Sequence, residues 1–337
     1  MSWRLPVAVS RARCFRGPDA DPAPGLHAYL TRPLRAGGPD PMSAASAFFV
    51  QFPHPGAEHH PAGPVMGWNL ADHRRKFLIC AGRYLDADDR VQEAELMFWG
   101  EWEPPSAIHA RWPPDDHLPR ALHRPYWAEP TRDGFRQNTD PWVFGDRMLY
   151  SNCKQTTRAG RHPTAMQKLT RGSVVCFGSA VGGQFCADTV LVVASAERWI
   201  PGEVQDLGAG NAFQACTAAA VATGSCGYAQ ASLTLYRGAT IDDPVDGMYS
   251  FVPARPAGAP RPRFARPPIR LPGLINPAST QSARGSSRPQ PARAVRNAWE
   301  AIQHQVLAAG LVLAVHLETP PKHIEDTAIP ASDRTRC

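Results

Sequence analysis

Residues 173–194 read SVVCFGSAVGGQFCADTVLVVA, and this stretch decides the fold more than any other part of the sequence. Its two halves, 173–177 and 185–194, are rich in the β-branched and aromatic residues that favour strands. Gly182 and Gly183 lie between them and permit the tight turn that joins two antiparallel strands. The sequence therefore predicts a β-hairpin here.

The same strand-like composition recurs on both sides of this hairpin. Further strands are predicted at 47–52, 76–84, 93–102, 233–236, 249–252 and 311–317. One helix is predicted from the Ala-rich stretch 212–222, and a second in which Trp299, Ile302 and Val306 share a face and Gly310 ends the helix. The expected fold class is α+β: a strand-dominated protein with a mixed or antiparallel sheet or a partly open barrel, and few helices.

Composition indicates a folded protein with irregular ends. The 337 residues are 43% hydrophobic, which is enough for a substantial core and excludes a wholly disordered chain. The 8 cysteines are too sparse for a small disulfide scaffold. We expect residues 1–41 to be a disordered basic Pro/Arg-rich extension, 42–320 a single α+β domain, and 321–337 a frayed tail. The residues before Met42 show no hydrophobic periodicity, whereas the first predicted strand follows soon after it. Met42 is therefore a candidate for the true start of the protein.

Arginine is distributed unevenly along the chain. The net charge is +6, yet residues 253–296 carry nine arginines and no acidic residue. This segment is also rich in proline, so we expect an extended, irregular arm whose guanidinium groups can neutralise phosphates. The candidates for phosphate contacts are Arg263, Arg266, Arg270 and Arg284. The alternative is a coding bias without functional meaning, because only four lysines stand against 32 arginines.

A polar cluster at 151–155, reading SNCKQ, precedes the hairpin. Asn and Gln amides can read the hydrogen-bonding edge of a base, and Lys154 can meet a phosphate. The hairpin adds Ser179 and Asp188. We expect a strand-built pocket whose ligand-binding residues are Asn152, Lys154, Gln155, Ser179 and Asp188, with a nucleotide or nucleic acid as the partner. The competing interpretation is a capped hairpin with ordinary turn residues.

The order of residues over 148–195 resembles that of nucleotide-modification-associated domains, which are found beside hypermodified-DNA systems. The motif is the Cys-Lys cluster followed, from Leu169, by Leu-x-x-Gly-Ser-Val-Val-x-Phe-Gly-Ser. The same segment is more distantly similar to the strand pattern of PUA/ASCH-type barrels that bind RNA or modified bases. These resemblances imply a barrel-like pocket that reads a base or nucleotide, lined by Asn152, Lys154, Gln155 and Ser179. A Gly-Asp pair commonly precedes the second strand in those families, whereas this chain has Gly172 and Ser173, so the resemblance does not extend to an acidic contact there.

Histidine and glutamate gather in the loop 54–60, reading HPGAEHH, and His73 follows. Such side chains can bind zinc or serve as base and acid. Proline and glycine exclude a helix here, so no helical face presents two histidines one turn apart. We therefore expect no metal site and weigh two interpretations, a polar loop that faces a substrate and an ordinary turn.

A second function class rests on three residues later in the chain. Arg237 in a predicted strand, Ser279 in a Ser-Thr pair and Glu318 beside the last predicted strand resemble, in that order, the Arg-Ser-Glu class of ADP-ribosyltransferases. The resemblance implies NAD as cofactor, with Arg237 on its phosphates, Ser279 supporting the nicotinamide pocket and Glu318 stabilising the oxocarbenium ion. The chain departs from that family at Gln281, where Ser or Thr is usual, and at His316, where Glu or Gln is usual. Catalysis is thus left open, and a non-catalytic interaction scaffold is a third alternative.

The sequence also bears on the compartment. The longest apolar run, 306–315, is about half the length that a bilayer requires, and Gly310 interrupts it. The N-terminal residues lack the uninterrupted apolar core of a secretory signal. We expect a cytoplasmic protein without a membrane partner, and the sequence predicts neither a particular cofactor nor an oligomeric state.

Overall fold

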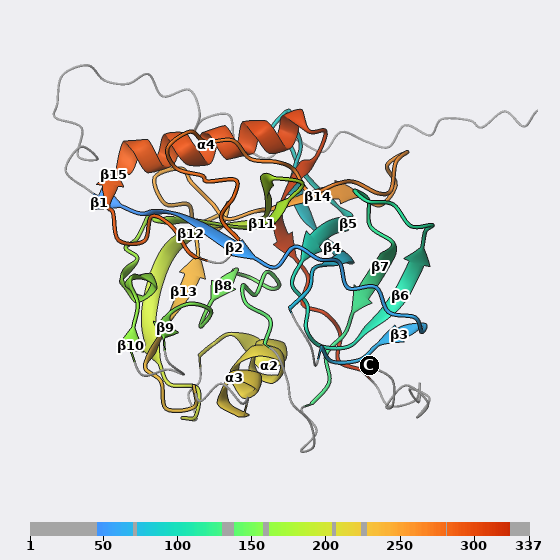
Figure 1. Cartoon of the computed structure of the whole chain (residues 1–337), viewed down its shortest axis with the longest axis horizontal. Helices are drawn as coiled ribbons and strands as arrows, with labels where there is room; N and C mark the ends of the chain where they lie inside the picture. Colours follow the sequence, from blue (N-terminus) through green and yellow to red (C-terminus); the bar gives the residue numbers. More distant parts are fainter. Residues whose placement is uncertain are drawn as a thin grey trace, which may run out of the picture. The chain divides into compact units, whose positions relative to one another are not determined.

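The structure is a computed structural model, and it describes residues 46–69, 73–129, 138–157, 162–203, 207–223, 228–280 and 282–323. The predicted extension at 1–41, the candidate start at Met42 and the tail from residue 324 onward lie outside these residues. Strands dominate the described part of the chain, as the sequence predicted, and they form two large sheets (Figure 1).

The predicted hairpin forms the centre of a five-stranded sheet. β11 (Val174–Val181) and β12 (Gln184–Trp199) pair antiparallel, and Gly182 and Gly183 join them with φ of 55° and 73°. Positive φ at both positions is typical of a two-residue hairpin turn, and glycine adopts it without strain. The sheet order is β2-β11-β12-β13-β8, with β2 at Phe49–His54, β13 at Leu233–Gly238 and β8 at Leu149–Tyr150. Because β2 runs parallel to β11, its last residue, His54, lies opposite Ser179.

Four strands of the second sheet close into a small barrel. β4 (Lys76–Leu85) and β5 (Val91–Gly100) pair along their whole length. β14 (Val252–Pro256) pairs with β5, and β16 (Val312–Leu317) pairs with both β14 and β4. A closed ring of antiparallel strands leaves no free edge within it. The sequence allowed a partly open barrel, whereas this one is closed.

Three more strands extend the second sheet beyond β4. β7 (Ala121–Pro125) pairs with the first residues of β4, and β6 (Ser106–Arg111) and β3 (Val65–Met66) follow in order. The sequence analysis did not predict β6 or β7. They lie in a proline-rich stretch, where the runs between prolines are too short to show the alternation of a strand.

Two helical segments accompany the sheets. α4 (Ala292–Ala308) buries the predicted face of Trp299, Ile302 and Val306, and Gly310 follows it with φ of 71°. α4 contacts β1 (Ser46–Ala47), β15 (Gln290–Pro291) and β16, and in Figure 1 it runs along the top of the view with β15 and β1 at one end. The Ala-rich stretch forms α2 (Gly210–Phe213), a π-helical turn η3 (Gln214–Ala218) and α3 (Ala219–Thr223). The remaining short elements are β9 (Thr156–Thr157), β10 (His162–Pro163) and the 3-10 turn η2 (Ala165–Lys168).

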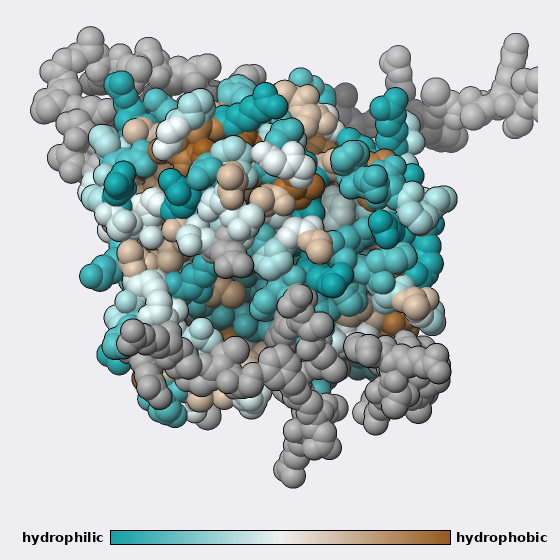
Figure 2. All heavy atoms as spheres, viewed as in Figure 1, coloured by the Kyte–Doolittle hydropathy of each residue, from teal (hydrophilic) through white to brown (hydrophobic). Residues whose placement is uncertain are grey.

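The two sheets are joined by isolated bridges and by a shared aromatic core. Val190 of β12 bridges to Phe251, and Cys186 bridges to Pro268, so β12 runs beside the segments that flank β14. Among the described residues, Val91 is the one large apolar side chain that is exposed, and the face drawn in Figure 2 is mostly hydrophilic. The large apolar side chains of the described residues are therefore mostly shielded from solvent, and the polar side chains that are also buried need a separate explanation.

The ends of the predicted arm and tail are more regular than expected. β14 occupies the first residues of the arm and α4 begins at Ala292, so the irregular part spans 257–289. At the other end, the backbone of Trp127 bonds to Pro321 and His323, and Trp127 bridges Lys322. Residues 321–323, predicted as the start of a frayed tail, are thus held by main-chain hydrogen bonds.

Candidate functional site

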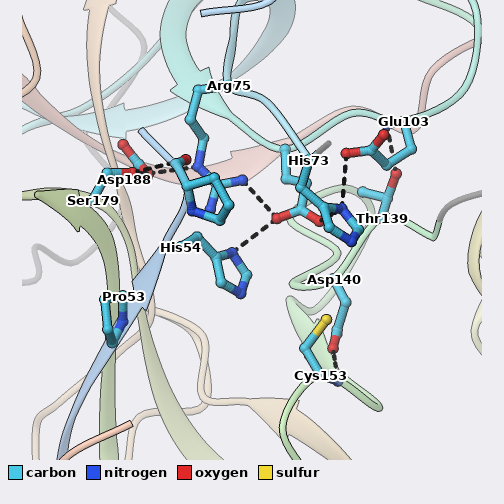
Figure 3. A network of polar contacts seen from close by, with 12 residues as sticks. Pro53, His54, His73, Arg75, Glu103, Thr139, Asp140, Cys153, Ser179 and Asp188 are labelled. Atoms are coloured by element: carbon cyan, nitrogen blue, oxygen red, sulfur yellow. Dashed lines mark hydrogen bonds and ion pairs between the residues drawn. The ribbon is translucent and has the colours of Figure 1, made fainter. Parts of the chain in front are cut away.

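Ionisable side chains gather where the two sheets meet (Figure 3). His54 ends β2, Arg75 immediately precedes β4, Glu101 immediately follows β5, and Asp188 lies in β12. All four are buried. In this interior their mutual interactions are stronger than they would be in water.

Arg75 links the two sheets through two ion pairs. Its Nη1 lies 2.6 Å from Glu101 Oε2 and its Nε lies 2.9 Å from Asp188 Oδ2. The backbone of Arg75 is fixed by hydrogen bonds to Ala57 and His59, each 2.8 Å long. Burial opposes the charge on Arg75, but Glu101 and Asp188 outweigh it and raise its pKa above the ordinary value. The guanidinium therefore stays charged.

Glu101 also contacts a histidine that is neutral. His54 Nδ1 lies 2.9 Å from Glu101 Oε2, and the ring packs against Phe52 with centroids 4.8 Å apart. Burial lowers the pKa of His54 to about 4, more than Glu101 raises it. Burial likewise opposes ionisation of Glu101, but its contacts with His54 and Arg75 outweigh it and hold its pKa well below the usual range. At neutral pH His54 therefore stays neutral and Glu101 stays ionised.

At one end the network approaches solvent through His73. Its Nδ1 lies 3.5 Å from Glu101 Oε1 and 3.3 Å from Glu103 Oε1, and 39% of the His73 side chain is exposed. These three residues offer ligand atoms within 4.8 Å of one another, so they could hold a metal ion. Lys76 is nearby and buried, and burial lowers its pKa to about 8.

At the other end the network leads to Arg266 of the arm. Ser179 Oγ lies 3.4 Å from Asp188 Oδ2 and accepts a 3.0 Å hydrogen bond from Arg266 Nη1. Arg266 also donates to the carbonyl of Gly56, and its guanidinium lies 4.8 Å from the centre of the Trp99 ring. The second oxygen of Asp188, Oδ1, has no hydrogen-bond partner among the described residues. Asp188 Oδ1 is thus a buried acceptor that could bind a donor from a ligand or from water.

Arg266 also forms part of the wall of a cavity of about 500 Å³. The other walls come from three segments. Glu58 lies in the loop after β2, Arg120 in the β6–β7 connection, and Gln184 at the start of β12 beside the hairpin turn. Ala265 of the arm lies at the exposed rim. The volume lies within the range that small-molecule sites occupy.

The predicted cluster at 151–155 lies near the network, but its turn is held by structural contacts. The Asp140 carboxylate accepts the backbone N–H groups of Ser151, Asn152 and Cys153 at 2.8, 3.0 and 2.7 Å. Burial raises the pKa of Asp140 to about 6 despite these hydrogen bonds. The Asn152 amide donates to Ser151 Oγ at 2.8 Å.

The two other predicted ligand-binding residues of this cluster also have partners within the protein. Gln155 bonds through both ends of its amide to the backbone of Thr234, at 2.7 Å each. Lys154 Nζ donates to the carbonyl of Pro53 and lies 4.3 Å from the centre of the Phe52 ring. Burial lowers the pKa of Lys154 to about 8. Neither residue, nor Asn152, belongs to the wall of the cavity, whereas Ser179 and Asp188 lie directly behind it.

Of the four arginines predicted to contact phosphates, one lies in the cavity wall and one beside it. Arg266 is the wall residue. Arg263 donates to the carbonyl of Pro119 at 3.5 Å, close to the rim. Arg270 and Arg284 are exposed and bond to neighbouring segments through their backbones.

The three residues that resemble an ADP-ribosyltransferase set have separate partners. Arg237 of β13 pairs with Glu197 of β12 at 2.5 Å. Ser279 donates to the carbonyl of Ser282 at 3.3 Å, and Glu318 follows β16 in the other sheet. Among the described residues, no hydrogen bond or ion pair joins any two of the three.

The central residues of the network, Arg75 and Glu101, were not predicted from the sequence as site residues. Arg75 precedes one predicted strand, and Glu101 and Glu103 fall at the end of another. Two carboxylates two residues apart at the end of an apolar strand can point to the same face if the chain stays extended. That pattern was the available signal, although it does not reveal the partner Asp188, which lies 113 residues from Arg75.

No protein-family model, curated protein or solved structure matches this chain. Within the described ranges, none of the helices is both long and apolar enough to cross a membrane. The resemblances of 148–195 and of Arg237, Ser279 and Glu318 therefore stay predictions, and the geometry above is the basis for assigning a function.

Acid should weaken the fold through His123. This ring is buried, its Nδ1 lies 3.1 Å from Ser106 Oγ, and burial, with a smaller contribution from Lys76, lowers its pKa to about 3. In the unfolded chain His123 takes up a proton as the pH falls through 6.5, whereas in the folded protein it stays neutral until about pH 3. The contribution of neutral His123 to the free energy of unfolding is therefore complete above pH 6.5 and declines as the pH falls below it. We expect the stability difference between the wild type and His123→Gln, measured by urea unfolding, to shrink from pH 7 to pH 5. The same difference at both pH values would contradict this account.

Proposed function

We propose that this protein binds a nucleotide or an unpaired base in the cavity beside Arg266. The observation that carries the proposal is the link from Arg266 in the cavity wall to Ser179, and from there to Asp188, deep in the network. The sequence analysis had predicted Ser179 and Asp188 of the hairpin as ligand-binding residues and, on a separate ground, Arg266 of the arm as a phosphate contact. A concave site backed by fixed polar groups favours ligand binding over an interaction scaffold.

The charges of the cavity wall favour a particular class of nucleotide. Arg120 and Arg266 can meet a phosphate, but Glu58, Asp115 and Asp116 also line the wall. A wall of mixed sign disfavours a highly charged triphosphate. We therefore expect nucleosides and nucleoside monophosphates to bind better than triphosphates.

Two of these acidic side chains already accept hydrogen bonds from the backbone. Glu58 Oε1 accepts the backbone N–H groups of Arg120 and Ala121 at 2.7 and 3.2 Å. Asp115 Oδ1 accepts those of His117 and Leu118 at 2.8 and 2.9 Å. Both side chains therefore fix the shape of the wall, and the amide of Gln184 is the neutral wall group suited to a base edge.

We also propose a cytoplasmic location. The free cysteines of the described chain are Cys80, Cys153, Cys176, Cys186 and Cys216. Unpaired thiols agree with a reducing compartment.

A thermal-shift screen with nucleosides, mono- and triphosphates, NAD and short single-stranded DNA and RNA tests the proposal. A ligand at a hundred times its Kd should stabilise the protein by about 2.7 kcal/mol, or raise its Tm by roughly 5 °C. We expect the largest shift with a nucleoside monophosphate, and we expect Ala265→Trp, which fills the rim, to remove it. Ala278→Trp places the same ring at an exposed position outside the wall and should keep the shift. A shift that survives Ala265→Trp, or no shift with any of these compounds, would overturn the proposal.

A further inference from the structure

We infer that His73, Glu101 and Glu103 form a binding site for a divalent transition-metal ion, of the zinc or manganese kind. None of the three belongs to the wall of the nucleotide cavity, so the ion would bind apart from the proposed nucleotide, although Arg75 links Glu101 to Asp188 behind that wall. One nitrogen and two carboxylates form a ligand set that such ions accept.

The spacing of the three side chains fits an ion better than a direct contact. His73 Nδ1 lies 3.5 Å from Glu101 Oε1 and 3.3 Å from Glu103 Oε1. A charge-assisted hydrogen bond between such groups is ordinarily about 2.7–2.9 Å long. Two ligands of a tetrahedral ion, each about 2.1 Å from it, lie about 3.4 Å apart. The nitrogen is therefore as far from each of the two oxygens as one ligand is from another, and the three residues offer ligand atoms within 4.8 Å of one another.

A buried carboxylate oxygen without a partner is the second observation. Glu103 is fully buried, yet its Oε2 has no hydrogen-bond partner among the described residues. The backbone of Glu103 is fixed on both sides, because its N–H donates to Thr139 Oγ1 at 3.1 Å and its carbonyl accepts the N–H of Asn69 at 3.1 Å. The side-chain amide of Asn69, also buried, has no hydrogen-bond partner within the described part of the chain. Such atoms usually bind something in a native protein, and a metal with its water would satisfy them.

The surrounding residues already hold one ligand in position. Arg75 and His54 both contact Glu101 Oε2, at 2.6 and 2.9 Å, while Oε1 lies nearest His73 at 3.5 Å. Outer contacts of this kind orient carboxylate ligands in metal sites. His73 is partly exposed, so an ion can reach the site and keep an open position for water. Because Arg75 and Lys76 lie nearby, we expect weaker binding than at a ligand set without cationic neighbours.

Equilibrium dialysis of the tag-free, chelator-treated full chain against ZnCl₂ or MnCl₂, with elemental analysis, tests this site. We expect one ion per chain and a loss of affinity of at least about tenfold in Glu103→Gln and in His73→Gln. His304→Gln removes an exposed histidine of α4 and should bind as the wild type does. If Glu103→Gln does not fold, the partly exposed His73→Gln carries the test. No bound ion, or equal binding by both site variants and the wild type, would show that a protonated His73 alone joins the carboxylates.

Discussion

Replacing Arg75 by methionine is expected to destabilise the protein by about 3–5 kcal/mol, because it leaves buried charges without their partner. Arg75 is fully buried and contacts both Glu101 and Asp188, which belong to different segments of the structure. Methionine preserves most of the side-chain volume, so the loss reports the charges and not a cavity. Urea unfolding at pH 7 measures it.

Arg83 provides the matched control for this experiment. It pairs with Asp242 at 3.1 Å, but their side chains are 38% and 72% exposed. Exposed pairs contribute about 0–1 kcal/mol, so Arg83→Met should change stability little. If Arg75→Met and Arg83→Met lowered the free energy of unfolding equally, the ion pairs of Arg75 would not hold the two sheets together.

Replacing Trp102 by alanine is expected to cost about 3–5 kcal/mol of unfolding free energy. The ring is fully buried, packs against Trp142 and Phe144 with centroids 5.8 and 5.3 Å apart, and donates through Nε1 to the carbonyl of Pro105 at 2.9 Å. Removing it leaves a large cavity and an acceptor without its donor. Because Trp102 lies between Glu101 and Glu103 in the sequence, its packing also fixes both carboxylates.

Trp112 serves as the control for Trp102. It is partly exposed. Its ring centre lies 6.4 Å from that of Phe77 and 5.5 Å from Cζ of the Arg263 guanidinium. Trp112→Ala therefore removes the same side chain from a position with less buried area, and the loss should be clearly smaller. Equal losses at the two positions, measured by urea unfolding, would contradict the burial assigned to Trp102.

The local elements of this fold could be predicted from the sequence because each has its own pattern. The hairpin at 173–194 combines β-branched runs with a Gly-Gly turn, and β4 and β5 have long apolar stretches. The helix α4 has one apolar face and a glycine after its end. In each case residues close in sequence carry the information. The α+β assignment as such stays a prediction, while the dominance of strands is confirmed.

The closure of the barrel could not be predicted in the same way. β16 pairs with β4, whose residues are more than 200 positions earlier, and neither strand carries a mark that specifies the other. β14 is only five residues long and borders a proline-rich arm, so its pattern is short. Pairings of this kind depend on the packing of the complete fold and not on local propensity.

The candidate site could be predicted only in part, for the same reason. Ser179 and Asp188 stand out as polar residues in an apolar hairpin, and Arg266 as one of several arginines in the arm. The bond from Arg266 to Ser179, and the pairing of Asp188 with Arg75, depend on contacts between distant segments. In contrast, Gln155 and Asn152 were polar residues in a turn, and both bond within the protein. The Gln155 amide bonds to the backbone of Thr234, and the Asn152 amide donates to the Ser151 hydroxyl.

The most direct test of the central claim is a calorimetric titration of the nucleoside monophosphate that gives the largest thermal shift. The cavity beside Arg266 predicts one ligand per chain, with affinity reduced at least about tenfold, or 1.4 kcal/mol, in Ala265→Trp and unchanged in Ala278→Trp. Equal affinities in the wild type and Ala265→Trp would place the ligand elsewhere, and the absence of binding heat in the wild type at several temperatures would contradict nucleotide binding itself.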